Sequence, residues 1–173
     1  MIEGYKEVLA EHPDITVVSE QFNKEWSPEA ALKQVEGALL ANQDDIVAVL
    51  SNNDGMAVGV KQALEAVGLD GKVGISGQDA ETAALQMIDK GTMSFTVFTE
   101  FSQMATDAVD LADALIRGTD LPEHATMDNG SGKEIPWVET EMVLVHQGNV
   151  KEFVESHSWW VTSDCLLYTS RCV

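Results

Sequence analysis

Short apolar runs alternate with amphipathic stretches along most of this chain, and that alternation constrains its fold more than any other feature. The apolar runs that we interpret as strands are residues 15–18, 46–50, 73–76 and 95–98. The amphipathic stretches that we interpret as helices are residues 28–41, 54–67, 81–90 and 102–117. Strands and helices in this order, joined by short loops, predict an α/β fold with a parallel sheet and right-handed crossovers. The uninterrupted apolar run 46–50 is typical of a strand covered by helices on both faces.

Local signals support these boundaries. Ser27, Pro28 and Glu29 supply an N-cap, a proline at the first helical position and an acid near the positive end of the helix. Glycines at 68, 91 and 118 end the other three helices. The pattern breaks after Pro122, where residues 127–134 are polar and glycine-rich. A late strand at 141–145 and a short helix at 150–155 close the predicted fold.

The charge of the chain excludes one class of partner. Its 173 residues include 29 Asp and Glu against 10 Lys and Arg, a formal net charge of −19, while the 45% hydrophobic content is ordinary for a globular protein. Such a surface repels phosphates, and the basic residues form no cluster, so we expect no nucleic acid partner. We also expect no signal peptide in this fragment, because the N-terminus lacks a basic segment followed by an apolar one.

The last fifteen residues differ from the rest. Residues 159–173 carry no net charge, contain both cysteines and two of the four tryptophans, and show no periodic pattern. The ending from Cys165 to Val173 looks like translated vector sequence, so we expect 159–173 to be a non-native tail. The alternative is a genuine, loosely ordered tail. The native portion, residues 1–158, then contains no cysteine and says nothing about redox compartment.

Polar or aromatic side chains follow three of the predicted strands. Asn53 and Asp54 come after the second strand, Gln78 and Asp79 after the third, and Trp26 after a loop that follows the first. Ligands of open parallel sheets bind beyond the carboxyl ends of the strands, so we expect these residues to converge at one edge of the sheet. Amide and carboxylate groups suit vicinal hydroxyls, and an indole face suits the C–H side of a sugar ring.

Each candidate also has a structural alternative. Asn53 or Asp54 is suited to cap the helix that begins there, and Asp79 to cap the helix near residue 81. Trp26 precedes an N-cap and is suited to a hydrophobic staple. Enzyme signatures are weak, because the four histidines lie far apart and no nucleophile elbow, phosphate loop or zinc motif is present. We therefore expect neither an enzyme nor a cofactor or metal site.

Three segments resemble the periplasmic sugar-binding proteins of ABC transporters, in particular the xylose-binding branch. They are Glu25–Leu32, Val49–Leu64 and Gly71–Ala80, and the most specific part is Ser76–Ala80. The resemblance runs from residue 1 to about 155. It implies a three-layer, parallel-sheet lobe of a type I periplasmic binding protein that is truncated at its N-terminus. It also implies a solute-binding component that holds a monosaccharide in a cleft between two lobes and presents it to ABC permease membrane subunits.

The resemblance also implies roles for individual residues. Trp26 would stack on the sugar, and Asn53 and Asp79 would bond its hydroxyls. Further candidate ligands are Asp54, Gln78, Thr99 and Glu100. Thr99 and Glu100 stand where xylose-binding members have a lysine, so a donor is lost and an acceptor gained. This departure weighs against xylose itself as the ligand.

Coverage is partial, because only the C-terminal portion of such a protein is matched. The helix 102–117 is implied to belong to the missing first lobe, which would leave its apolar face exposed. That face consists of Met104, Ala105, Ala108, Leu111, Ala112 and Leu115. We expect the isolated chain to be aggregation-prone and to bind sugar weakly, and the intact protein to be a periplasmic monomer.

Two other readings remain. The effector-binding domain of a sugar-responsive transcription repressor shares this fold and is the main alternative. A phosphoacceptor receiver or a small α/β enzyme would need an acidic cluster with a lysine at the strand ends, and Thr99 stands where that lysine is expected.

Overall fold

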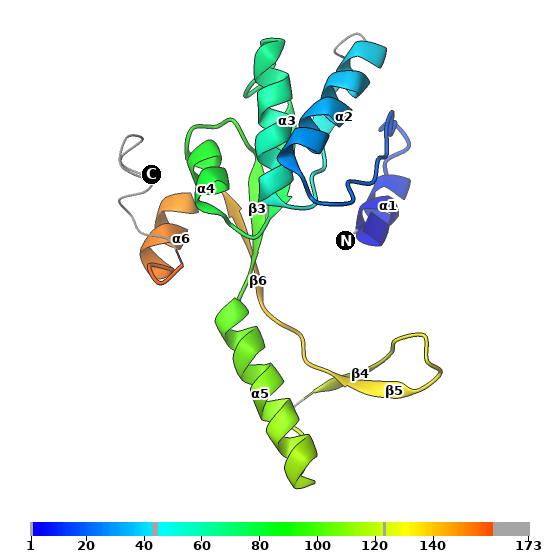
Figure 1. Ribbon diagram of the computed structural model, residues 1–173, viewed down its shortest axis with the longest axis vertical. Coiled ribbons are helices and arrows are strands. Elements are labelled where there is room, and N and C mark those ends of the chain that lie inside the picture. Colours follow the sequence, from blue (N-terminus) through cyan, green and yellow to red (C-terminus); the bar gives the residue numbers. More distant parts are fainter. Residues whose placement is uncertain (1, 43–44, 123, 161–173) are drawn as a thin grey trace. The chain divides into compact units, whose positions relative to one another are not determined.

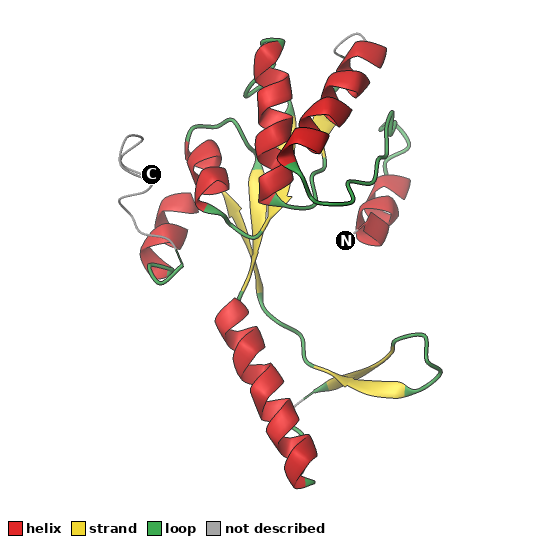
Figure 2. Cartoon of the chain, in the orientation of Figure 1, coloured by secondary structure: helices red, strands yellow, loops and turns green. Residues whose placement is uncertain are grey.

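Helices and strands alternate from residue 28 to residue 117 in the computed structural model, which describes residues 2–42, 45–122 and 124–160 (Figures 1 and 2). The chain forms two compact units. The first runs up to Val97 and resumes at Leu144, and the second comprises Phe98–Val143.

The elements include all those that were predicted except the strand at residues 15–18. They are α1 (Ile2–Ala10), α2 (Pro28–Ala41), β1 (Ala48–Val49), α3 (Asp54–Ala66), β2 (Gly74–Gln78), α4 (Thr82–Asp89), β3 (Phe95–Thr99), α5 (Phe101–Arg117), β4 (Ala125–Asp128), β5 (Glu134–Trp137), β6 (Met142–His146) and α6 (Val150–Ser156). The main sheet has the order β1-β2-β3-β6, and β1, β2 and β3 are parallel. The parallel α/β fold is confirmed.

The core of the first unit forms where α3 packs on β2 and on its neighbouring helices α2 and α4. Its largest fully buried apolar side chains include Leu39, Leu64, Ile75, Leu85, Ile88, Val150 and Val154. In the described part of the chain, no helix combines the length and the apolar character needed to cross a membrane.

Two expectations about the first strands are wrong. Residues 15–18 form no strand, and the side chains of Ile15, Val17 and Val18 are about half exposed. The strand expected over 46–50 shrinks to Ala48–Val49, and Val47 is 80% exposed. The two errors share a cause. Without the first strand, β1 is the edge strand of the sheet and pairs only with β2, so it is not covered as an internal strand would be.

Three further elements, α1, β4 and β5, were not predicted. Helix α1 buries none of its residues, so it lacks the clear apolar stripe that identifies a packed helix. The hairpin of β4 and β5 lies where a polar loop was expected, with Asp128 paired to Glu134. Its turn is built on Asp128, whose Oδ1 accepts hydrogen bonds from the backbone N–H groups of Gly130 and Gly132 at 2.9 and 3.1 Å. The Asp-Asn-Gly-Ser-Gly sequence is a turn signal that could have revealed the hairpin.

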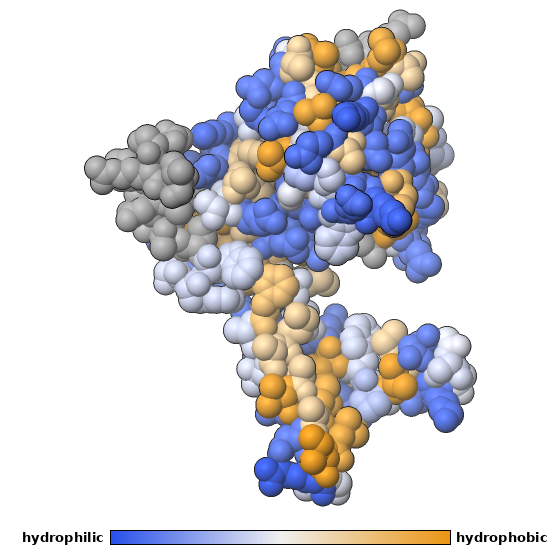
Figure 3. All heavy atoms as spheres, in the orientation of Figure 1, coloured by the Kyte–Doolittle hydropathy of each residue, from blue (hydrophilic) through white to orange (hydrophobic). Residues whose placement is uncertain are grey.

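In the second unit, most of the expected apolar face of α5 is exposed: Met104 and Leu115 are 45% and 69% exposed, and Leu111 is partly buried. Val109 and Ile116, which were not part of the expected face, are 66% and 85% exposed, and Ala114 is the one residue of this helix that is buried. Figure 3 shows hydrophobic residues gathered over the part of the chain that Figure 1 labels α5. Such a continuous exposed face on a helix is typical of a surface that another segment covers.

The chain after α6 packs back on the first unit. His157 stacks on Phe153 with ring centroids 4.2 Å apart, and the indole Nε1 of Trp160 donates to the carbonyl oxygen of Ala80 at 2.9 Å. The tail was expected to begin at residue 159, yet Trp160 makes a specific contact with the loop that follows β2. Residues 161–173, including both cysteines, lie outside the described residues.

Candidate functional site

Trp26 lies on the loop that precedes α2. Two hydrogen bonds close this loop: Asn23 Nδ2 donates to Ser27 O at 2.8 Å, and Ser27 N donates to Asn23 Oδ1 at 3.0 Å. Trp26 has a φ of 51°, which is unfavourable for a residue other than glycine, and its side chain is 67% exposed. An indole this exposed does not act as a hydrophobic staple. The loop therefore holds a large aromatic side chain in solvent.

Close packing of α2 on α3 positions that loop. A Cβ added at Gly59 of α3 would overlap the carbonyl oxygen of Pro28, the first residue of α2. The missing side chain thus lets the start of α2 rest directly on α3. Because Trp26 lies two residues before Pro28, this contact fixes where the indole leaves the fold.

Asn53 caps α3. Its Oδ1 accepts a hydrogen bond from the backbone N–H of Met56 at 2.9 Å, and its backbone carbonyl accepts one from Ser51 Oγ at 2.9 Å. The capping alternative is therefore correct for Asn53. Asp54 is not the cap but the first residue of the helix. Among the described residues, the Nδ2 of Asn53 has no hydrogen-bond partner, so the amide can donate to a ligand while its oxygen caps the helix.

Asp54 is fully buried and its carboxylate is used inside the protein. Oδ1 accepts a hydrogen bond from Thr96 Oγ1 at 2.8 Å, and Oδ2 accepts one from the backbone N–H of Glu81 at 2.8 Å. Burial raises the pKa of Asp54 to about 7, although these two hydrogen bonds act in the opposite direction. A candidate ligand by sequence, Asp54 has no exposed surface in this structure.

Asp79 follows β2 directly and remains partly exposed. Its backbone N–H donates to Val97 O at 2.9 Å, which continues the pairing of β2 with β3. Its φ of 103° is rare outside glycine, and burial raises the pKa of its carboxyl group. The N-cap of α4 is Glu81, so Asp79 does not cap that helix. Gln78, the last residue of β2, is also partly exposed.

Thr99 and Glu100 belong to the second unit. Thr99 ends β3 and is partly exposed. Glu100 occupies the N-cap position of α5, where its backbone N–H donates to Glu141 O at 3.1 Å and its Oε1 accepts from Ser102 Oγ at 2.7 Å. Both stay predictions as ligands.

The structure adds two residues that the sequence reasoning missed. Thr96 is fully buried in β3, and Trp160 reaches the loop after β2. A threonine within a short buried strand was a usable signal, because a buried hydroxyl needs a hydrogen-bond partner. Nothing in the sequence around Trp160 pointed to its partner, which lies 80 residues earlier.

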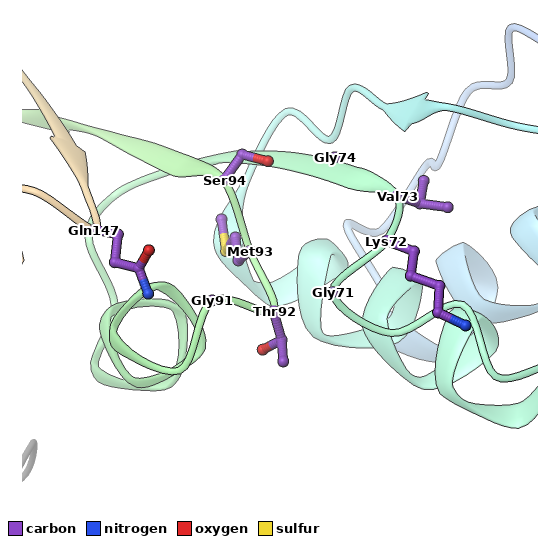
Figure 4. Close-up of a pocket in the computed structure, with 9 residues that line it drawn as sticks. All are labelled: Gly71, Lys72, Val73, Gly74, Gly91, Thr92, Met93, Ser94 and Gln147. Atoms are coloured by element: carbon purple, nitrogen blue, oxygen red, sulfur yellow. The ribbon is translucent and has the colours of Figure 1, made fainter.

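A surface hollow lies at the opposite edge of the sheet. Its lining comes from Gly71–Gly74, Gly91–Ser94 and Gln147 (Figure 4). Gly74 begins β2 and Ser94 immediately precedes β3, so the hollow adjoins the amino ends of these strands. The one charged side chain in its lining, Lys72, donates to Gly68 O at 2.9 Å. The hollow is therefore separate from the candidate residues, which follow the carboxyl ends.

We expect the contribution of Asp54 to the free energy of unfolding to decrease as the pH is raised from about 4 to about 7. The pKa of Asp54 is about 7 in the folded state and about 4 when unfolded, so the folded state binds the extra proton in this window. The stabilisation is complete below the unfolded pKa and is lost as pH rises through the folded pKa, by up to about 4 kcal/mol. Urea denaturation across this range checks it.

The matched variant for this measurement is Asp54→Asn, which does not titrate. Other carboxylates contribute their own pH dependence, so the informative quantity is the difference between the unaltered protein and the variant. If that difference is the same at pH 4 and pH 7.5, Asp54 has an ordinary pKa and the prediction fails.

The chain is similar to known proteins over most of its length. Residues 1–120 match the family described as periplasmic binding protein domain. The D-xylose-binding periplasmic protein of Escherichia coli (strain K12) is 40% identical over 154 residues, which cover 87% of this chain and 46% of that protein. The D-xylose-binding periplasmic protein of Haemophilus influenzae is 38% identical over 140 residues, 81% of this chain and 42% of that protein. The chain spans less than half the length of these relatives.

A solved structure has a similar fold. The ABC transporter solute-binding protein from Clostridium phytofermentans, solved with bound β-D-glucose, superimposes with a TM-score of 0.75 at 27% identity. The match covers 95% of this chain and 54% of that one. The similarity thus extends over nearly the whole chain and about half of the solved protein.

Proposed function

Because this chain belongs to the periplasmic binding protein family, we propose that the complete protein is the monosaccharide-binding component of an ABC-type import system. By complete protein we mean this chain together with the N-terminal lobe that the resemblance implies, since the chain spans less than half the length of these relatives. It binds sugar without covalent chemistry, acts in the periplasm and delivers its ligand to the membrane subunits of a permease. The repressor alternative receives no support from the two relatives named above, which are periplasmic proteins.

The observation that carries this proposal is the exposed indole of Trp26. Its loop is closed by two hydrogen bonds and holds the backbone at a φ of 51°, a conformation that costs of order 1–3 kcal/mol. Strain that keeps an aromatic ring out of the core is typical of a ligand site. A rigid indole offers a flat apolar face to the C–H side of a pyranose.

Polar groups for the hydroxyls come from the loops after β1 and β2. Asn53, after β1, offers an amide donor. Gln78 and Asp79 lie at the end of the neighbouring strand β2, and both side chains are partly exposed. Thr99 and Glu100 stay predictions as ligands. We propose a neutral monosaccharide related to xylose as the ligand.

The exposed face of α5 fits the partial coverage of the relatives. We propose that this helix packs on the N-terminal lobe of the complete protein, which would bury Val109, Leu115 and Ile116. With this face buried, the complete protein would be a monomer, whereas the isolated chain would self-associate through α5.

We place the start of the non-native tail after Trp160, because Trp160 contacts the loop after β2.

Calorimetric titration of the complete protein with a panel of pentoses and hexoses, D-xylose included, tests this function. We expect one sugar to bind with a Kd of about 1 μM, and Trp26→Ala to weaken that binding by about tenfold or more. Phe22→Ala is the matched control, because Phe22 is 81% exposed in the same loop region, and it should leave the Kd within about twofold. Absence of binding to every sugar, or equal effects of the two variants, would contradict the proposal.

A further inference from the structure

The turn after β2 is strained at two successive residues. Asp79 and Ala80 have φ values of 103° and 52°, and together with Trp26 they are the non-glycine residues of the described chain with positive φ. Each such conformation costs of order 1–3 kcal/mol and persists only where the surroundings impose it. Something must therefore hold Asp79 and Ala80 in this turn.

Three successive backbone N–H groups of the turn each donate a hydrogen bond to a different residue. Asp79 N donates to Val97 O at 2.9 Å, Ala80 N to Thr96 Oγ1 at 3.3 Å, and Glu81 N to Asp54 Oδ2 at 2.8 Å. Thr96 Oγ1 donates in turn to Asp54 Oδ1 at 2.8 Å. The carbonyl of Ala80 accepts from Trp160 Nε1. Two side chains, Asp54 and Thr96, thus hold the turn from inside.

The fold makes room for this carboxylate at a cost. A Cβ at Gly77 would overlap Asp54 Oδ1 and Met93 Cε, so a larger residue at this position of β2 would displace the buried carboxylate or the Met93 side chain. Burying a carboxylate against neutral donors is unfavourable compared with apolar packing of similar volume. A role in stability alone does not explain such a group.

Asp54 also joins the two loops that carry predicted ligands. It directly follows Asn53, the cap of α3, and it binds the backbone two residues after Asp79. One carboxylate therefore sets the separation between the loop after β1 and the loop after β2. A shift of either loop would move a predicted ligand relative to the other.

We propose that Asp54 and Thr96 are positioning residues, which hold the turn at Asp79 and Ala80 so that Asp79 faces the sugar, without touching the sugar themselves. This inference rests on the proposed function. It assigns the buried pair a role in affinity and leaves the contacts with the sugar to Asp79, Asn53 and Trp26.

The first test is hydrogen exchange of the complete protein, measured by mass spectrometry on a peptide spanning residues 76–88. Thr96→Val keeps the shape of the side chain and removes the hydroxyl, so the Ala80 and Glu81 amides should exchange at least tenfold faster. Thr92→Val is the matched control. The hydroxyl of Thr92 donates to Met87 O, and Thr92 follows the C-terminal end of α4, whereas the turn at Asp79 and Ala80 precedes its N-terminal end. Thr96→Ser should restore slow exchange. Unchanged exchange in Thr96→Val overturns the inference.

The second test is sugar affinity, measured well below the melting temperature of each variant, so that lost stability alone does not change the Kd. Thr96→Val and Asp54→Asn should weaken binding by about tenfold or more, while Thr96→Ser and Thr92→Val stay within about threefold. Faster exchange with unchanged affinity would make the pair merely structural and overturn the inference. If the unaltered protein binds no sugar, the proposed function itself fails, which is a different result.

Discussion

Replacing Gly59 with alanine is expected to destabilise the complete protein by about 3 kcal/mol, the upper part of the range for overpacked cores. The new methyl group would overlap the carbonyl oxygen and carbon of Pro28, which are backbone atoms and cannot rotate away. Helix α2 must then move off α3, which disturbs the packing of Ala31, Val35 and Leu39. Urea denaturation measures the loss.

Gly37 provides the matched control, since it is also a helical glycine, on the exposed side of α2. A Cβ there meets nothing within 4 Å, so Gly37→Ala should stabilise the protein by about 0.5–1 kcal/mol through helix propensity. Both substitutions replace glycine with alanine, yet they should change the free energy of unfolding in opposite directions. A neutral or stabilising Gly59→Ala would mean that the contact between α2 and α3 is looser than described.

Replacing Asp79 with asparagine is expected to weaken sugar binding by about 100-fold. Hydrogen bonds to a charged group contribute about 1.5–3 kcal/mol, and a carboxylate can accept from two vicinal hydroxyls at once. Asparagine tolerates positive φ better than alanine does, so this variant keeps the turn and changes only the acceptor. Calorimetric titration of the complete protein with the sugar that it binds measures the effect.

Asp14→Asn is the control for that experiment, because Asp14 is exposed in the turn that follows α1. It should leave the Kd unchanged. A Kd for Asp79→Asn within about threefold of the unaltered protein would remove Asp79 from the site. Trp26 and Asn53 would then have to account for the affinity with other partners.

Helices α2, α3 and α4 were predictable because their signals are local. The Ser27-Pro28 start and the glycines at 68 and 91 mark helix ends, and β2 and β3 are buried runs bounded by these helices. Residues 15–18 have equally strong strand propensity, yet no strand forms there. Propensity describes a residue's preference, whereas a strand also needs a neighbour to pair with.

At the site, residue type and position after a strand were enough to select Trp26, Asn53 and Asp79 as candidates. They were not enough to divide the roles of Asn53 and Asp54, since both residue types cap helices and bind ligands. Asp54 rather than Asn53 is buried because of two residues on β2 and β3. Gly77 has no side chain and leaves room for the Asp54 carboxylate, and Thr96 donates a hydrogen bond to it.

Periodicity and capping residues thus predicted a parallel α/β lobe, and the acidic composition led us to expect no nucleic acid partner, because each is a property of neighbouring residues or of the whole composition. Tertiary packing determined which polar groups face inward. The hydrogen bonds of Asp54 reach residues 27 and 42 positions further along the chain, and that of Trp160 reaches back 80 positions. Partners so distant in sequence meet only once the sheet is assembled, so no local pattern could have assigned them.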